Sequence, residues 1–110
     1  MGVYTEVDIY ATFKTEQQAE KHIDNLEDNV KNYIKDATQI LMENFNFGFN
    51  DCDLDGNVII IKLSSGRYQH AEWQTEHLLA YLKTTDGFIE FNAEATRPET
   101  IVWWNIDEEE

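Results

Sequence analysis

The stretch Glu43–Leu63, ENFNFGFNDCDLDGNVIIIKL, is the part of the chain on which the rest is expected to fold. Phenylalanines alternate with polar residues over 45–49, as on a strand with one buried face. The acidic segment 51–57 has the composition of a turn, since Asp-Gly between two apolar runs is the strongest short hairpin signal. The β-branched run VIIIKL at 58–63 is typical of a central, well-covered strand. The sequence therefore predicts a hairpin against which the other elements pack.

Further elements are predicted on both sides of this hairpin. Apolar and polar residues alternate over 3–13, which is typical of a half-buried strand. A helix is predicted over 69–83, and alternation resumes over 88–95 before a last apolar run, IVWWNI, at 101–106. The predicted buried side of the 69–83 helix consists of Ala71, Thr75, Leu78 and Leu82, with Trp73, His77 and Tyr81 at its flanks.

The longest predicted helix begins after Thr15 and extends to about Glu43. Thr15 followed by Gln18 has the spacing of a capping box. The apolar residues recur every three or four positions: Ala19, Ile23, Leu26, Val30, Tyr33, Ile34, Ala37, Ile40 and Leu41. This stripe favours packing on a sheet, and the alternative is a helix–helix seam between two copies of the chain. A bend is expected near Asp24-Asn25 or Asp28-Asn29, because these residues are weak helix formers.

The resulting element order is β-α-β-β-α-β-β. This order predicts the α+β class: a ferredoxin-like split β-α-β antiparallel sheet with two helices on one face and an extra C-terminal strand. A chain of 110 residues fits one domain with its own core, so 1–110 is expected to form a single acidic domain. The acidic end, 107–110, is expected to be a flexible tail.

The charge restricts the classes of partner. The chain has 22 acidic and 8 basic residues, for a net charge of −14 and a pI near 4.3. Such a field repels phosphates and anionic lipids, so direct binding to nucleic acid or membrane is disfavoured and a basic protein partner is favoured. The single cysteine, the absence of a signal-peptide pattern and the lack of a long apolar run predict a cytoplasmic protein.

Metal binding has weak support in the sequence. Asp51, Asp53, Asp55 and Gly56 match the first half of a calcium loop, but Lys62 stands where the loop needs a bidentate glutamate. A hairpin turn is the favoured interpretation, and loose binding of a divalent cation is the alternative. The histidines, His22, His70 and His77, lack the spacing of a zinc site. No cofactor is expected.

Catalysis has little support either. Cys52 lies among carboxylates, which raise a thiol pKa and disfavour the nucleophilic thiolate. No phosphate-binding loop or nucleophile elbow is present in the sequence. We therefore expect a protein that is not an enzyme. The alternative is an enzyme of unidentified type that uses Arg67, His70 and Glu72.

Two acidic surfaces are predicted. Glu16, Glu20, Asp24 and Asp28 are spaced four apart and would form a stripe along the first helix, with carboxylates about 6 Å apart along the axis. This spacing is comparable to that of phosphates on a nucleic-acid strand, and the alternative is an ordinary solvated helix face. The second surface is the sheet face opposite the helices, which would carry Tyr4, Glu6, Asp8, Tyr10, Phe88, Glu90, Asn92, Glu94 and one of Trp103 and Trp104. Aromatics among carboxylates suit a basic protein partner.

These surfaces predict a small, acidic, non-enzymatic binding or inhibitor protein that docks on a basic, nucleic-acid-binding surface of a protein partner. The predicted contact residues are Glu6, Asp8, Tyr10, Glu16, Glu20, Asp24, Asp28, Glu90, Glu94 and Trp103. In design, though not in any sequence motif, the chain resembles the nucleic-acid mimics that phages and mobile elements use against host defence. The alternative is a homodimeric small-ligand-binding or structural domain. Its pocket, between sheet and long helix, would be lined by Tyr33, Arg67, Trp73 and His77.

Overall fold

The computed structural model describes residues 5–38, 49–65, 68–96 and 100–107, and for 37–38, 68 and 100–107 it describes the backbone alone. This part of the chain has an α+β fold, with one antiparallel sheet and helices packed on it. The elements in chain order are β1 (Thr5–Phe13), α1 (Glu16–Ile23), α2 (Leu26–Thr38), β2 (Asp51–Asp55), β3 (Val58–Ser65), α3 (Tyr68–Leu82), β4 (Phe88–Thr96) and β5 (Thr100–Asp107). The predicted strands around β1, β4 and β5 and the predicted second helix are therefore confirmed. Asp107, predicted to begin the tail, ends β5.

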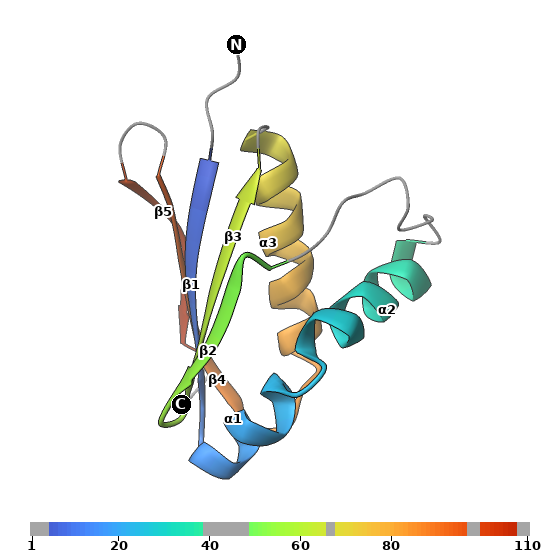
Figure 1. The fold of residues 1–110 in the computed structure, drawn as a ribbon, viewed down its shortest axis with the longest axis vertical. Coiled ribbons are helices and arrows are strands. Elements are labelled where there is room, and N and C mark those ends of the chain that lie inside the picture. The colour runs from blue at the N-terminus through green and yellow to red at the C-terminus, as the bar shows by residue number, and fades with distance from the viewer. Residues whose placement is uncertain (1–4, 39–48, 66–67, 97–99, 108–110) are drawn as a thin grey trace.

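The five described strands lie in the order β2-β3-β1-β4-β5. The three described helices lie on one face of this sheet (Figure 1), and no described helix or strand covers the opposite face. The last strand, β5, pairs with β4 as the predicted C-terminal hairpin. No helix in the described ranges is long and apolar enough to cross a bilayer.

The predicted hairpin at Asp55-Gly56 is confirmed, but the prediction that the whole acidic segment 51–57 forms its turn is wrong, because 51–55 is a strand. Residues 51–55 pair with β3 up to the partners Asp55 and Val58, so only Gly56 and Asn57 form the turn. Gly56 has φ 62°, the conformation that a type II′ turn needs at its first central position. Pairing with the β-branched strand β3 outweighs the poor strand propensity of aspartate. Of the predicted partner strand at 45–49, only Phe49 lies within the described residues.

The predicted long helix is divided into α1 and α2 at Asp24-Asn25. Asp24 is extended, with φ −66° and ψ 125°, and Asn25 has φ 59°. Asparagine tolerates this left-handed conformation better than most residues, which explains why the break falls here. Of the two predicted bend positions, this one is confirmed, and Asp28-Asn29 lies inside α2. The cap at Thr15 is also confirmed, because its Oγ1 accepts a hydrogen bond of 3.1 Å from the Gln18 N–H.

The core lies between the sheet and the helices. Its largest fully buried side chains are Val7, Ile9, Phe13, Leu26, Val30, Ile34, Ile59, Ile61, Leu63, Leu78, Leu82 and Phe91. The helical stripe is therefore used within the monomer over α2, where Leu26, Val30 and Ile34 are at most 1% exposed. These three residues are not available for the alternative helix–helix seam.

A bulge changes which face the start of β4 presents. Phe13 pairs with Phe88 and Thr12 pairs with Glu90, so Ile89 is an extra residue on β4. Phe88 consequently turns toward the core, where its ring lies edge-on to the ring of Phe13 with centroids 5.9 Å apart. The prediction that Phe88 lies on the face opposite the helices is wrong, because strict alternation cannot show a bulge.

Candidate functional site

Carboxylates gather on the sheet face that no described helix covers, which we call the open face. Side chains of successive strand residues point to opposite faces, so the residues between the buried ones share this side. The open face carries seven carboxylates from three strands: Glu6, Asp8, Asp51, Asp53, Asp55, Glu90 and Glu94. Among the described strand side chains, Lys62 on β3 is the only basic one on the open face.

Pairing between the strands sets these charges side by side. In one row across the sheet, Asp51 lies opposite Lys62, Lys62 opposite Asp8, and Asp8 opposite Glu94. Lys62 therefore has an acid on each side, whereas Asp8 and Glu94 face each other as like charges. Like charges in directly opposite positions destabilise a sheet. The Asp8–Glu94 pair thus acts against folding.

At the end of the open face near the β2–β3 turn, the two middle strands carry apolar side chains instead of the charges of Glu6, Asp8 and Lys62. Tyr10 on β1 is 42% exposed and is the one large exposed apolar side chain among the residues whose burial is described. It lies opposite Ile60 of β3, and Val58 lies two positions before Ile60 on the same strand; both aliphatic side chains are half-buried. An aromatic and aliphatic patch is therefore flanked by carboxylates on β2 and β4.

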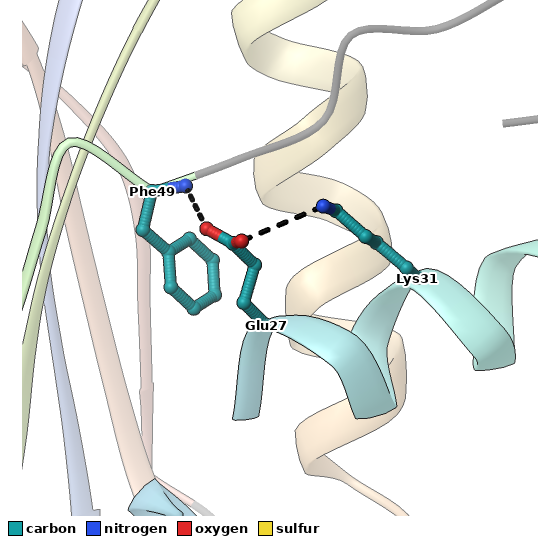
Figure 2. A network of polar contacts seen from close by, with 3 residues as sticks. All are labelled: Glu27, Lys31 and Phe49. Atoms are coloured by element: carbon teal, nitrogen blue, oxygen red, sulfur yellow. Dashed lines mark hydrogen bonds and ion pairs between the residues drawn. The ribbon is translucent and has the colours of Figure 1, made fainter. Parts of the chain in front are cut away.

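One carboxylate on the covered side, that of Glu27, links two elements of the fold. Figure 2 shows that Glu27, at the start of α2, accepts a hydrogen bond of 2.7 Å from the Phe49 N–H. Its other carboxylate oxygen forms an ion pair of 3.5 Å with Lys31 Nζ. These contacts attach α2 to the residue that leads into β2. By contrast, none of the seven open-face carboxylates forms an ion pair within 4 Å among the residues that the structure describes. One of the seven, Asp51, accepts a hydrogen bond of 2.9 Å from the Cys52 N–H.

Cys52 lies on β2 with its side chain turned away from the open face. The pKa of its thiol is raised to about 11, first by burial and then by the charges of Asp53, Asp51 and Glu27. The predicted direction is confirmed, but burial, and not the neighbouring acids, is the larger cause. The thiol is therefore protonated and poorly nucleophilic at neutral pH.

The three aspartates of β2 do not form a shared cation site. Alternate residues on a strand are about 7 Å apart, too far for Asp51, Asp53 and Asp55 to meet at one ion with ligand distances of about 2.3–2.6 Å. Accordingly, no group of three or more metal-ligating side chains occurs in the described part of the chain. The loose cation site proposed as an alternative is not supported.

The predicted stripe on the first helix is interrupted. Glu16 and Glu20 are exposed on α1, but Asp24 belongs to the break and Asp28 to the first turn of α2. All four carboxylates are exposed, yet the regular helical spacing applies only to the first two. A continuous row of four is wrong, because the chain changes direction at Asp24-Asn25.

The residues of the predicted ligand pocket are used in packing. The Tyr33 ring contacts Tyr81 with centroids 5.8 Å apart, and the Trp73 ring lies 4.3 Å from that of His77. Two pockets lined by described residues lie elsewhere. One, of about 320 Å³, lies between the α1–α2 break and the start of β2, and the other, of about 180 Å³, lies beside Glu6 and Lys62. Arg67 and the proposed catalytic trio that includes it lie partly outside the described residues.

Five of the predicted contact residues share the open face: Glu6, Asp8, Tyr10, Glu90 and Glu94. Tyr4 and the side chains of Trp103 and Trp104 lie outside the described residues. The sequence prediction missed Asp51, Asp53 and Asp55 as members of this surface, although the alternation of aspartates with Cys52 and Leu54 was a signal of a strand with one polar face. Comparison of the chain with protein-family models, with curated proteins and with solved structures found no match.

Proposed function

We propose that this protein is a non-enzymatic binding protein that docks its open face on a basic surface of another protein. The observation that carries the proposal is the set of seven carboxylates on one uncovered sheet face, without ion-pair partners among the described residues. The proposal assigns the docking to the cytoplasm, where a single reduced cysteine is expected.

Electrostatics support a protein partner with clustered lysine and arginine. A surface with one sign of charge attracts a complementary surface, speeds association and excludes acidic partners. A basic partner would also relieve the repulsion between Asp8 and Glu94, so the bound protein would be more stable to unfolding than the free protein. Exposed charges are screened by salt, and the affinity is therefore expected to fall steeply as the ionic strength rises.

We further propose that the partner's basic surface is one that otherwise holds nucleic acid. Alternate strand residues place the β2 carboxylates about 7 Å apart, which is on the scale of phosphate spacing along one strand of nucleic acid. This is the mode of action of the nucleic-acid mimics of phages and mobile elements, and the chain's net charge of −14 supports it.

The strand order supports assigning the fold to a variant of the ferredoxin-like arrangement. Its four strands β2-β3-β1-β4 are antiparallel neighbours, and β5 extends the sheet beyond β4. The departure is the first helical connection, which consists of α1 and α2 in place of one helix.

A pull-down from host lysate at low and high salt, read by mass spectrometry, tests the proposed function. The wild-type protein is expected to capture a basic, nucleic-acid-handling protein that is lost at high salt. Glu90→Lys with Glu94→Lys should abolish the capture, because both residues lie on the open face. Glu16→Lys with Glu20→Lys makes the same charge change on exposed positions of α1 and should retain it.

Equal capture by both double variants would contradict the assignment to the open face. Recovery of only the protein's own chain would favour the alternative of a homodimeric ligand-binding or structural domain.

A further inference from the structure

The open face has two acidic bands that run along the strands, with an apolar patch between them at one end. The acidic bands consist of Asp51, Asp53 and Asp55 on β2, and of Glu90 and Glu94 on β4. Between them, at the end near the β2–β3 turn, the neighbouring strands β3 and β1 carry an apolar patch of Val58, Ile60 and Tyr10, and further along they carry Lys62, Asp8 and Glu6. Carboxylates therefore border this apolar patch on both sides, from Asp53 and Asp55 on β2 and from Glu90 on β4.

The dimensions of these bands match those of an α-helix. β2 and β4 are separated by three strand spacings, which is about 14 Å. A helix with its side chains is about 10–12 Å in diameter, so one helix fills the space between the two acidic bands. The described part of β1 on this face runs from Glu6 to Thr12, about 20 Å, which corresponds to about 13 helical residues.

We propose that the occupant of the open face is a basic amphipathic α-helix of the partner, which lies along β1 and β3. This inference rests on the proposed function. The apolar stripe of the helix contacts Tyr10 and Ile60, and its lysine or arginine side chains on each flank reach the aspartates of β2 and the glutamates of β4. Docking adds a helical layer to the uncovered face and turns the sheet into the middle layer of three.

Charge and hydrogen bonding select this occupant over others. A second copy of the chain carries the same net charge of −14, so like surfaces would repel. An extended peptide gains its main-chain hydrogen bonds at a sheet edge, whereas a sheet face offers it none. A helix satisfies its own backbone groups and can present an apolar stripe between two rows of cations.

Two synthetic peptides of about 14 residues test the inference, since this length covers the face. Both contain only leucine and lysine in equal numbers. In one peptide the leucines recur at helical spacing, and in the other leucine and lysine alternate strictly, as on a strand. We expect the helical peptide to bind roughly tenfold more tightly by calorimetry at about 0.15 M salt, and to gain helical circular dichroism on binding.

Substitutions in the protein test whether the helical peptide binds at the open face. Tyr10→Thr should weaken the helical peptide about tenfold, as for the loss of an aromatic anchor, and should leave the alternating peptide unchanged. Asp53→Asn and Glu90→Gln, one from each acidic band, should each weaken the helical peptide. Glu20→Gln, an exposed position on α1, is the matched control and should have no effect.

Equal affinity for the two peptides, with the same dependence on Asp53 and Glu90, would overturn the helix proposal and leave the proposed acidic docking function standing. Binding of both peptides that does not change in the Asp53 and Glu90 variants would overturn both proposals.

Discussion

Strand β1 carries two different surfaces on its two sides. Val7, Ile9 and Ala11 are fully buried beneath the helices, whereas Glu6 and Asp8 point to the open face from the same backbone. The covered side is made of close-packed apolar side chains, and the open side sets like charges opposite each other. The covered face therefore contributes to stability, whereas the open face contains a pair of like charges that lowers it. In the proposed function, a basic partner would offset this cost.

The largest expected difference between the two faces is the loss of stability when an aromatic side chain on each face is truncated. Phe91→Ala removes a fully buried ring and should lower the free energy of unfolding by about 3–5 kcal/mol. Tyr10→Ala, on the open side of the neighbouring strand, should change it by less than about 1 kcal/mol, because its ring is 42% exposed. Urea denaturation of both variants measures the difference. Comparable losses would show that the open face also supports the fold.

The same substitution on two glutamates should have opposite effects. Glu27→Gln weakens the hydrogen bond to the Phe49 N–H and removes the ion pair with Lys31, and should destabilise by about 1 kcal/mol. Glu94→Gln relieves the repulsion with Asp8 and should stabilise by a few tenths of a kcal/mol. Thermal unfolding at low salt measures both. A stabilising Glu27→Gln would contradict the structural role of that carboxylate.

The raised pKa of the Cys52 thiol should affect its chemical reactivity more than the stability of the fold. Burial and the adjacent carboxylates raise the pKa of its thiol from 9.0 to about 11, so its thiolate fraction at pH 8 should be roughly 100-fold below that of an ordinary thiol. Because the folded pKa is raised, the related contribution to stability is full below pH 9 and lost as the pH rises toward 11. Alkylation by iodoacetamide, followed by mass spectrometry across this range, measures the shift. Rapid alkylation of the folded protein at pH 8 would contradict the burial of Cys52.

Much of the covered face was predictable because burial leaves a clear period in the sequence. The alternation over 3–13 placed Val7, Ile9 and Phe13 in the core, and the spacing along the long helix placed Leu26 and Val30 there. The exact break in that helix was not predictable, since Asp24-Asn25 and Asp28-Asn29 are equally weak helix formers. In the structure α1 packs on strands of the sheet and α2 packs on α3, and the break at Asp24-Asn25 lies between these two packing partners.

The open face was predicted only in part. Glu6, Asp8, Glu90 and Glu94 lie on one side, as alternation predicted. The β2 aspartates were assigned to a turn, because aspartate is a poor strand former and Asp-Gly favours a turn. Their strand conformation depends on pairing with β3, whose β-branched residues favour a strand although the aspartates themselves do not. The bulge at Ile89 was likewise invisible, since it arises from the register between two strands.

The stability of a protein with a neutralised open face tests the central claim most directly. The variant combines Asp8→Asn, Asp53→Asn, Glu90→Gln and Glu94→Gln, and its free energy of unfolding is compared with that of the wild type at about 0.01 M and about 1 M salt. We predict that the variant is more stable at low salt, by about 1 kcal/mol, and that the gap closes at high salt. A variant that is less stable than the wild type at both salt concentrations would contradict the claim, because the carboxylates would then support the fold.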